Sequence, residues 1–215
     1  MIDSADTPRK RGLSAELTKF GTRFSEAFRR FDEANRSDPN LVTVEGVAHP
    51  QELLYAERLT DWVLRLAPEA SEPLLLAARS QHIRRWTVPR ASYEMTRAGY
   101  LKWRADLKQF HATQSAKILG EVGYDEETIQ RVRDLNLKKL LGRDADSQVL
   151  EDALCLVTLQ YQLTDLVAKT EPTKMIGILR KTWKKMSQAA RNHALALTYS
   201  DAEKRLIEQA LSEAG

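Results

Sequence analysis

Apolar residues recur every three or four positions along most of this chain. From Ser14 onward, this spacing predicts a helix that ends near the turn-forming residues 37–40. Its apolar positions are Leu17, Phe20, Phe24, Phe28 and Phe31. The same spacing predicts further helices at about 51–67, 71–83, 92–121, 125–140, 144–167, 172–186 and 201–211. The pattern therefore predicts about eight helices.

Very little of the chain has the character of β structure. Residues 41–50 hold the only β-like run, which is too short and too isolated to found a sheet. Residues 1–12 are polar and aperiodic, so we expect a mobile N-terminal tail there. No internal repeat or low-complexity linker interrupts the rest. We therefore expect an all-α protein with a single helical-bundle domain over residues 13–215.

Composition argues against an all-β fold, a disulfide-bonded protein and a membrane protein. Nine Gly and seven Pro are few for a turn-dense all-β fold. The net charge of +3 does not by itself imply a polyanionic partner. A single cysteine, Cys155, excludes an internal disulfide and fits a reducing compartment. No apolar stretch approaches the ~20 residues that a bilayer requires, so we expect a cytoplasmic protein with no membrane association.

Three residues capable of metal ligation fall on helices that the pattern predicts to be buried. His82 ends an apolar run, His111 lies on the long predicted helix, and Asp152 begins the most apolar one. A buried carboxylate needs a partner, such as a metal, a cation or a histidine. Neutral imidazoles and a carboxylate suit divalent Fe, Mn, Co, Ni or Zn. The alternative is that each histidine bonds to backbone carbonyls and that Asp152 only places negative charge near the start of its helix.

The order of these residues resembles that of the HD-domain superfamily of helical, metal-dependent phosphohydrolases. The family's first paired ligands close a helix of the form Ala-Ala-Leu-Leu-His-Asp-Ile, and residues 77–83 read AARSQHI here. A later histidine corresponds to His111 and a final aspartate to Asp152, and the order agrees across residues 50–170. The resemblance implies an HD-like core and a divalent metal.

This sequence departs from the HD pattern in the first ligands. Gln81 stands where the superfamily has His, and His82 stands where it has Asp. The first-helix His has no counterpart, and Glu52 or Glu57 would complete the metal site in its place. The resemblance therefore also allows a degenerate site, or an oxygenase of the HD-like type with two iron ions.

A closer resemblance is to an uncharacterised family, the domain-of-unknown-function 4202 family. It rests on the strings QHIRRWTVPR (81–90), GYLKWRADLKQFHA (99–112) and LEDALCLV (150–157). The likeness covers residues 30–210, and it implies no particular reaction.

A basic and aromatic cluster surrounds His82 in the sequence. Guanidinium groups grip phosphate or carboxylate with two parallel hydrogen bonds, and tryptophans stack on bases or cations. We therefore expect five residues to bind an anionic, phosphorylated substrate (Arg85, Trp86, Arg90, Trp103 and Arg104). The alternative is that the arginines pair with nearby carboxylates and the tryptophans are core.

These expectations lead to one main hypothesis and two others. The main one is a metal-dependent hydrolase for an anionic small molecule, with His82, His111 and Asp152 as catalytic metal ligands. The second is a non-catalytic nucleotide- or RNA-binding module that uses the same arginines. The third is an oligomeric scaffold in which the phenylalanine stripe of the first helix docks a second copy, although packing of that stripe on the chain's own core is the preferred interpretation.

Overall fold

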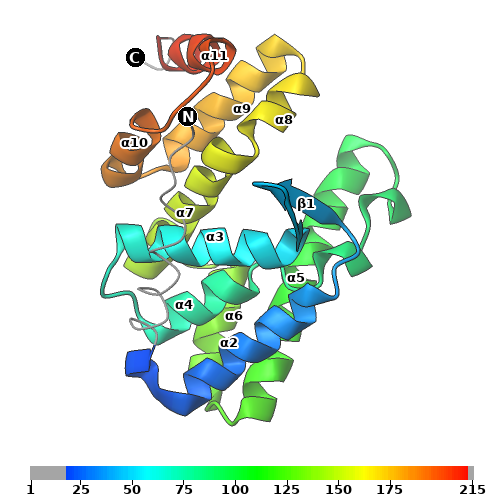
Figure 1. The fold of residues 1–215 in the computed structure, drawn as a ribbon, viewed down its shortest axis with the longest axis vertical. Coiled ribbons are helices and arrows are strands. Elements are labelled where there is room, and N and C mark those ends of the chain that lie inside the picture. The colour runs from blue at the N-terminus through cyan, green and yellow to red at the C-terminus, as the bar shows by residue number, and fades with distance from the viewer. Residues whose placement is uncertain (1–17, 213–215) are drawn as a thin grey trace. The chain divides into compact units, whose positions relative to one another are not determined.

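The computed structural model describes residues 18–212 (Figure 1). Its elements are η1 Thr18–Phe20, α2 Gly21–Arg36, β1 Leu41–Val44, β2 Val47–Pro50, α3 Gln51–Leu66, α4 Glu72–Ser80, η2 Arg85–Thr87, η3 Arg90–Ser92, α5 Arg97–Val122, α6 Glu126–Leu137, α7 Ala145–Tyr161, α8 Leu163–Ala168, α9 Pro172–Lys185, α10 Gln188–Leu195 and α11 Asp201–Ser212. The all-α prediction is confirmed. The tail predicted at 1–12 lies outside the described residues.

Internal contacts divide the chain into two compact units. Among the described residues, the first unit contains 18–61 together with Ala70–Leu140, and the second contains Trp62–Glu69 together with 141–212. The single domain expected over 13–215 stays a prediction.

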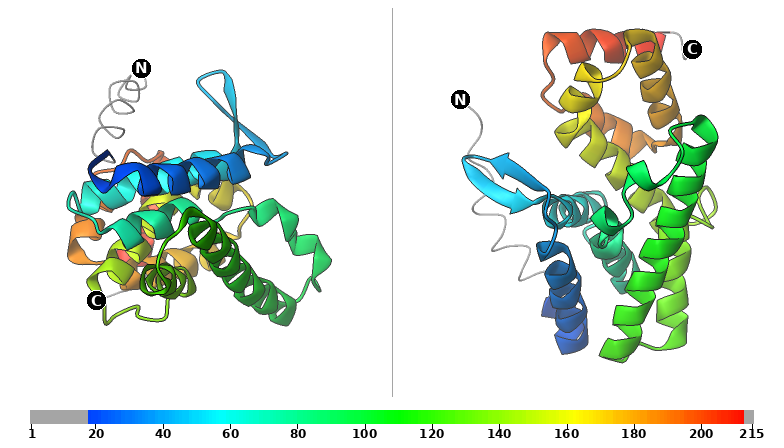
Figure 2. Two further views of the ribbon diagram at one scale, coloured as in Figure 1. Left: turned by 90° about the horizontal axis from the view of Figure 1, so that it is seen from below. Right: turned by 90° about the vertical axis from the view of Figure 1, so that its right-hand side faces the viewer.

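The first unit is a layered group of helices. Helix α2 packs against α4 and α5, and α4 packs against α6. The long α5 and the shorter α6 run antiparallel, side by side (Figure 2). Phe24, Phe28 and Phe31 are buried, at 1%, 7% and 0% exposure. The phenylalanine stripe of α2 therefore packs inside its own chain, as the preferred interpretation expected.

Helix α5 begins later than the periodicity predicted, at Arg97 instead of near residue 92. The side chain of Thr96 accepts a hydrogen bond from the Gly99 backbone N–H at 3.1 Å, which is an N-cap. Gly99 is required at this position, because a Cβ there would overlap the carbonyl oxygen of Glu94. The helix ends at Val122, one residue after the predicted end, and Gly123 follows it with a left-handed φ of 91°.

The β-like run at 41–50 forms a two-stranded antiparallel hairpin, with Val44 opposite Val47. At its turn, Glu45 and Gly46 have φ values of 50° and 81°. Two successive positive φ angles define the tight turn that matches the twist of paired strands. The run was expected to found no sheet, and this was wrong for the run itself, which pairs with its own second half in a two-stranded sheet.

The second unit contains a helix break and a short helix that the periodicity did not predict. The helix expected at 144–167 is divided into α7 and α8 at Gln162, whose φ of −124° and ψ of −11° are not helical. Helix α10 was not predicted at all, because eight residues give too few turns to establish a pattern. The Ser187 side chain caps it by accepting a hydrogen bond from the Ala190 N–H.

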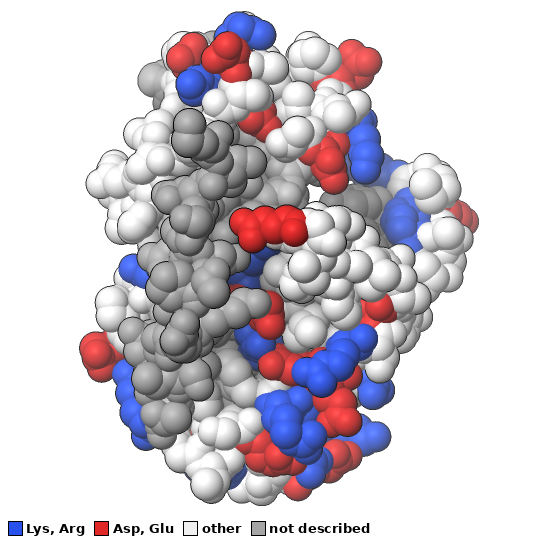
Figure 3. Space-filling model, in the orientation of Figure 1, with Lys and Arg blue, Asp and Glu red and all other residues white. Residues whose placement is uncertain are grey.

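Charged side chains of both signs alternate along α2 (Figure 3). Glu26 accepts hydrogen bonds from Arg29 and Arg30, each at 2.8 Å. Such pairs one helical turn apart stabilise a helix slightly. Among residues 18–212, no helix combines the length and the apolar character needed to cross a membrane.

Candidate functional site

His82 lies in a tight turn that follows α4 in the first unit. The next residue but one, Arg84, has a left-handed φ of 52°, which is uncommon for a residue with a side chain. The Arg84 N–H donates a hydrogen bond to the side-chain oxygen of Asn35, which is fully buried at the end of α2. Asn35 therefore holds the turn in the conformation that places His82.

Glu52 lies in the first turn of α3 and faces this turn. Its backbone N–H donates to a carboxylate oxygen of Asp38 at 3.0 Å, and its carbonyl accepts from the Asn35 amide at 3.5 Å. Its side chain is only 4% exposed. One carboxylate oxygen lies 3.2 Å from Nδ1 of His82, and the other lies 3.5 Å from Nη1 of Arg85. Glu52 thus contacts both His82 and a cation.

His111 comes to the same place from α5. Its ring is buried at 3% exposure, and its Nδ1 lies 2.9 Å from the carbonyl oxygen of Ile83. Since that carbonyl can only accept, Nδ1 of His111 carries the proton. The ring centroids of His111 and His82 are 5.7 Å apart, and the ring of Tyr55 stacks on His82 at 4.0 Å. Two imidazoles therefore lie side by side with an aromatic ring covering one of them.

Burial sets the charge state of this cluster. It is the main cause that lowers the pKa of His111 to about 3, and the neighbouring His82 adds to the effect. Burial also lowers the pKa of His82, against the opposing influence of Glu52, and the positive charges of Arg85 and Lys138 lower it further. Both imidazoles are therefore neutral at pH 7.

Glu52 is the charged member of the cluster. Burial by itself raises the pKa of its carboxyl group, but the hydrogen bond from His82 and the positive charge of Arg85 outweigh burial and lower the pKa. A carboxylate hydrogen-bonded to Nδ1–H of an imidazole fixes both its tautomer and its ring orientation. Glu52 therefore acts on His82 as an orienting group.

The arrangement leaves the other nitrogen of each ring available. With Nδ1 of His82 on Glu52 and Nδ1 of His111 on a carbonyl, each Nε2 carries a lone pair, and no hydrogen bond engages either atom within residues 18–212. Such lone pairs serve as a general base or as metal ligands. In the described part of the chain, no three His, Cys, Asp or Glu side chains form a group able to hold a metal ion. The residues thus offer a pair of imidazole ligands and an orienting carboxylate.

Two of the predicted metal ligands, Glu57 and Asp152, have protein partners of their own. Glu57 lies 3.9 Å from Nη2 of Arg79. Asp152 belongs to the second unit, where its Oδ1 accepts hydrogen bonds from the Ser187 N–H at 2.8 Å and the Gln148 amide at 3.0 Å. Asp152 therefore supports the start of α10, which is the structural role that a buried carboxylate can fill.

Three of the five residues expected to bind substrate are engaged in local structure. Arg90 donates to the carbonyls of residues 93, 94 and 96, Trp103 Nε1 donates to the Val88 carbonyl, and Arg104 contacts the hydroxyl of Tyr100. Trp86 is half-buried. Arg85 is different, since it lies between Glu52 and the ring of Trp103 with a third of its side chain exposed.

Sequence reasoning missed the residues that support the cluster. Tyr55 follows Glu52 by three positions, so one helical turn brings both to the same face of α3, and this spacing was a usable signal. Asn35 and Asp38 gave no signal, because their partners lie 49 and 14 residues away along the chain. Such contacts follow from the tertiary fold alone.

Comparison with known proteins connects this chain to one family. The model of the Domain of unknown function (DUF4202) matches residues 25–207, which is most of its length and includes the whole histidine cluster. The chain belongs to the DUF4202 family. No curated protein and no solved structure matches it.

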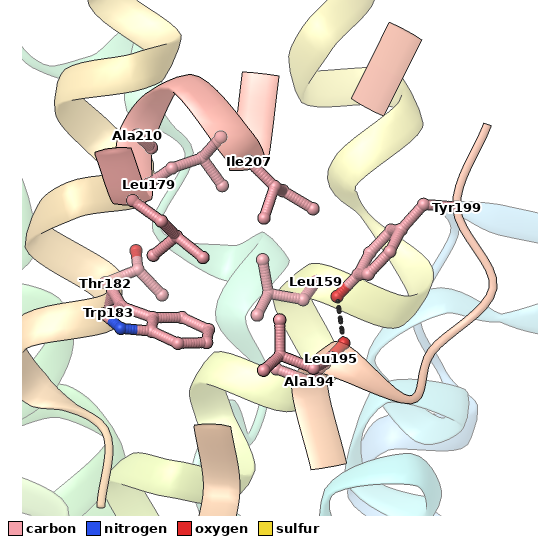
Figure 4. Close-up of a pocket in the computed structure, with 10 residues that line it drawn as sticks. Leu159, Leu179, Thr182, Trp183, Ala194, Leu195, Tyr199, Ile207 and Ala210 are labelled. Atoms are coloured by element: carbon pink, nitrogen blue, oxygen red, sulfur yellow. Dashed lines mark hydrogen bonds between the residues drawn. The ribbon is translucent and has the colours of Figure 1, made fainter. Parts of the chain in front are cut away.

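A second feature of this DUF4202 chain is an apolar pocket within the second unit (Figure 4). It lies among α7, α9, α10 and α11, and Trp183 and Tyr199 are among the residues that line it. The Tyr199 hydroxyl donates to the Ala194 carbonyl at 2.9 Å. Its interior volume of about 20 Å³ admits one water-sized group. The pocket offers no room for a substrate, so the histidine cluster remains the candidate site.

Proposed function

We propose that this protein is a hydrolase for a phosphorylated or otherwise anionic small molecule, with its centre at His82 and His111. One observation carries the proposal: both rings have Nδ1 engaged as a donor, and both are neutral, so each offers a lone pair on Nε2. Paired neutral imidazoles with fixed tautomers are typical of sites that hold a metal ion and of sites that move protons.

The charges around the cluster support an anionic substrate. Arg85 and Lys138 both exert positive charge on His82, and Glu52 contributes a single negative charge. Arg85 keeps donors free on its exposed side, because only Nη1 contacts Glu52, at 3.5 Å. In this proposal Arg85 binds the anionic group of the substrate with the planar fork of its guanidinium.

The remaining roles follow from the contacts. His82 and His111 would hold a divalent Fe, Mn, Co, Ni or Zn ion through Nε2, with other ligands from water or substrate. A bound ion of this kind supplies a hydroxide nucleophile at neutral pH and polarises a phosphoryl oxygen. Glu52 keeps the proton on Nδ1 of His82, the Ile83 carbonyl does the same for His111, and Tyr55 shields one face of His82 from water.

The test is elemental analysis of protein purified without chelator, together with hydrolysis of simple phosphomonoesters. We expect the wild type to carry a divalent metal and to release phosphate, and His82→Gln and His111→Gln to lose both. His193→Gln is the matched control, because His193 is exposed on α10. Circular dichroism establishes that each variant is folded. Equal metal content and equal turnover in all four proteins would refute the proposal.

The binding-module hypothesis gives a different result in the same experiment. It is favoured by Arg85, which keeps a third of its side chain exposed beside the cluster. A protein of that kind binds an anion such as inorganic phosphate through Arg85 without turnover. Its affinity then survives His111→Gln and falls in Arg85→Ala.

A further inference from the structure

The segment from Arg84 to Lys108 in the first unit is strongly basic. It contains seven Lys and Arg against two Asp and Glu, a net charge of +5, whereas the whole chain has +3. The segment comprises η2, η3 and the start of α5. Much of it faces solvent, and Met95, Tyr100 and Leu101 are 80%, 41% and 56% exposed. A surface that is both cationic and apolar is unusual for a solvated helix end.

Aromatic rings alternate with the cations along this segment. Arg85 lies 5.2 Å from the centre of the Trp103 ring. Lys102 lies 5.6 Å from the ring of Tyr93, and Arg104 lies 5.9 Å from the ring of Tyr100. Three cation–aromatic pairs therefore occur within about two turns of α5 and the loop before it. Each presents a planar face beside a positive charge.

Several of these cations are not neutralised by the protein. Arg84 and Arg97 are exposed, and within residues 18–212 neither forms an ion pair with a carboxylate. The guanidinium of Arg104 contacts only the neutral hydroxyl and ring of Tyr100. By contrast, Lys102 is paired with Asp106 at 2.6 Å. The segment therefore keeps positive charge available for a partner.

The backbone under this surface is held in place before any partner binds. Arg90 donates to three carbonyls of the loop before α5, and the indole of Trp103 donates to the Val88 carbonyl. Gly99 lies close against the Glu94 carbonyl and fixes how the loop enters the helix. A surface ordered in advance loses less conformational entropy on binding.

We propose that residues 84–104 form a binding surface for single-stranded nucleic acid. Exposed bases stack on the rings of Tyr100, Tyr93 and Trp103, and the phosphates between them pair with Arg84, Arg97 and Arg104. Alternation of rings and cations fits the alternation of bases and phosphates along one strand. An acidic protein would pair with the cations but would not require the exposed rings. Nucleic acid engages both, because its phosphates pair with the cations and its bases stack on the rings.

The proposal is independent of the hydrolase proposal, and its test uses full-length protein with EDTA present. Fluorescence anisotropy measures binding of labelled oligouridine and oligothymidine of about 16 nucleotides, and of a duplex of the same length. Salt is varied from about 50 to about 200 mM. The variants are Arg97→Ser/Arg104→Ser, Tyr100→Ala and Tyr100→Phe. The control is Lys181→Ser/Lys184→Ser, which removes the same charge from exposed positions on α9.

We expect the single strands to bind more tightly than the duplex. The Arg97→Ser/Arg104→Ser variant reduces the slope of log affinity against log salt by about 0.7 for each cation removed, and the α9 control leaves it unchanged. Tyr100→Ala weakens binding by about fivefold or more at constant charge, whereas Tyr100→Phe stays within about twofold of the wild type.

Four results overturn the proposal. These are no binding at the lowest salt, an equal affinity for the duplex, an equal loss in the α9 control, and an unchanged affinity in Tyr100→Ala. If Tyr100→Ala is unchanged while polyglutamate competes fully with the oligonucleotide, the surface binds acidic protein instead.

Discussion

The ion pair between Arg79 and Asp32 makes a sharp prediction about stability. Two guanidinium nitrogens of Arg79 donate to the two carboxylate oxygens of Asp32, at 2.6 and 2.7 Å. The Arg79 side chain is 7% exposed and also lies over the ring of Phe28. Replacing Asp32 with alanine leaves a buried cation whose nearest remaining carboxylate, on Glu57, is 3.9 Å away.

The expected cost of Asp32→Ala is about 3 kcal/mol. Breaking one side of a buried ion pair costs about 3–5 kcal/mol. The lower end applies here, because Asp32 is itself 24% exposed and Glu57 partly compensates. The control is Glu33→Ala, which breaks an exposed pair with Arg29 whose side chains are 58% and 68% exposed. Such an exposed, solvent-screened pair contributes little to stability.

Urea unfolding followed by circular dichroism measures both changes. The double variant Asp32→Ala/Arg79→Met should recover most of the loss, because it removes the buried charge and retains an apolar side chain over Phe28. The reasoning is refuted if Asp32→Ala falls within 1 kcal/mol of Glu33→Ala, which is about the size of one ordinary surface effect. It is also refuted if the double variant is no more stable than Asp32→Ala.

Two further predictions concern the buried His111 and Asp152, which sequence analysis expected to be a metal ligand. The folded pKa of His111, about 3, lies below its unfolded value, so the unfolded chain binds more protons and stability falls as pH decreases from about 6.5. In metal-free protein, His111 accounts for about 2 kcal/mol of the decrease in the free energy of unfolding between pH 7 and pH 5. Urea unfolding should therefore show a smaller decrease for His111→Gln and an unchanged decrease for His193→Gln. Asp152→Asn retains the Oδ1 acceptor and should lose less than about 1 kcal/mol, whereas Asp152→Ala should lose about 2 kcal/mol in the same assay because the Ser187 N–H is left unpaired. An equal loss in both Asp152 variants would show that charge, and not the acceptor atom, is what this position requires.

Sequence periodicity predicted those helices that have several turns and a clear cap. The α4 helix is an example: it was predicted from residue 71, and the Ser71 side chain caps it by accepting a hydrogen bond from the Leu74 N–H. The start of α5 and the interruption at Gln162 could not be read in this way. Both depend on which backbone N–H and C=O groups form hydrogen bonds in the folded chain. The spacing of apolar residues does not indicate those bonds.

The candidate site was predicted only in part, for a physical reason. The apolar pattern singled out His82 and His111, because a polar side chain beside apolar residues requires a partner, and the fold brings their ring centroids to 5.7 Å from each other. The same reasoning applies to Asp152, yet its partner is a backbone N–H at the start of α10. A buried polar residue therefore predicts a bond, without predicting whether the bond is made to a ligand or to the protein.

This distinction separates the arginines as well. Arg90 and Arg79 are close in sequence to Arg85 and have the same chemistry, but their donors are used by carbonyls and by Asp32. Arg85 reaches the orienting carboxylate Glu52 through one long contact of 3.5 Å and keeps a third of its side chain in solvent. In the proposed function, the free N–H donors of Arg85 beside the two neutral imidazoles bind the anionic group of the substrate. For this reason, substrate affinity should depend on Arg85, and protein stability on Arg79.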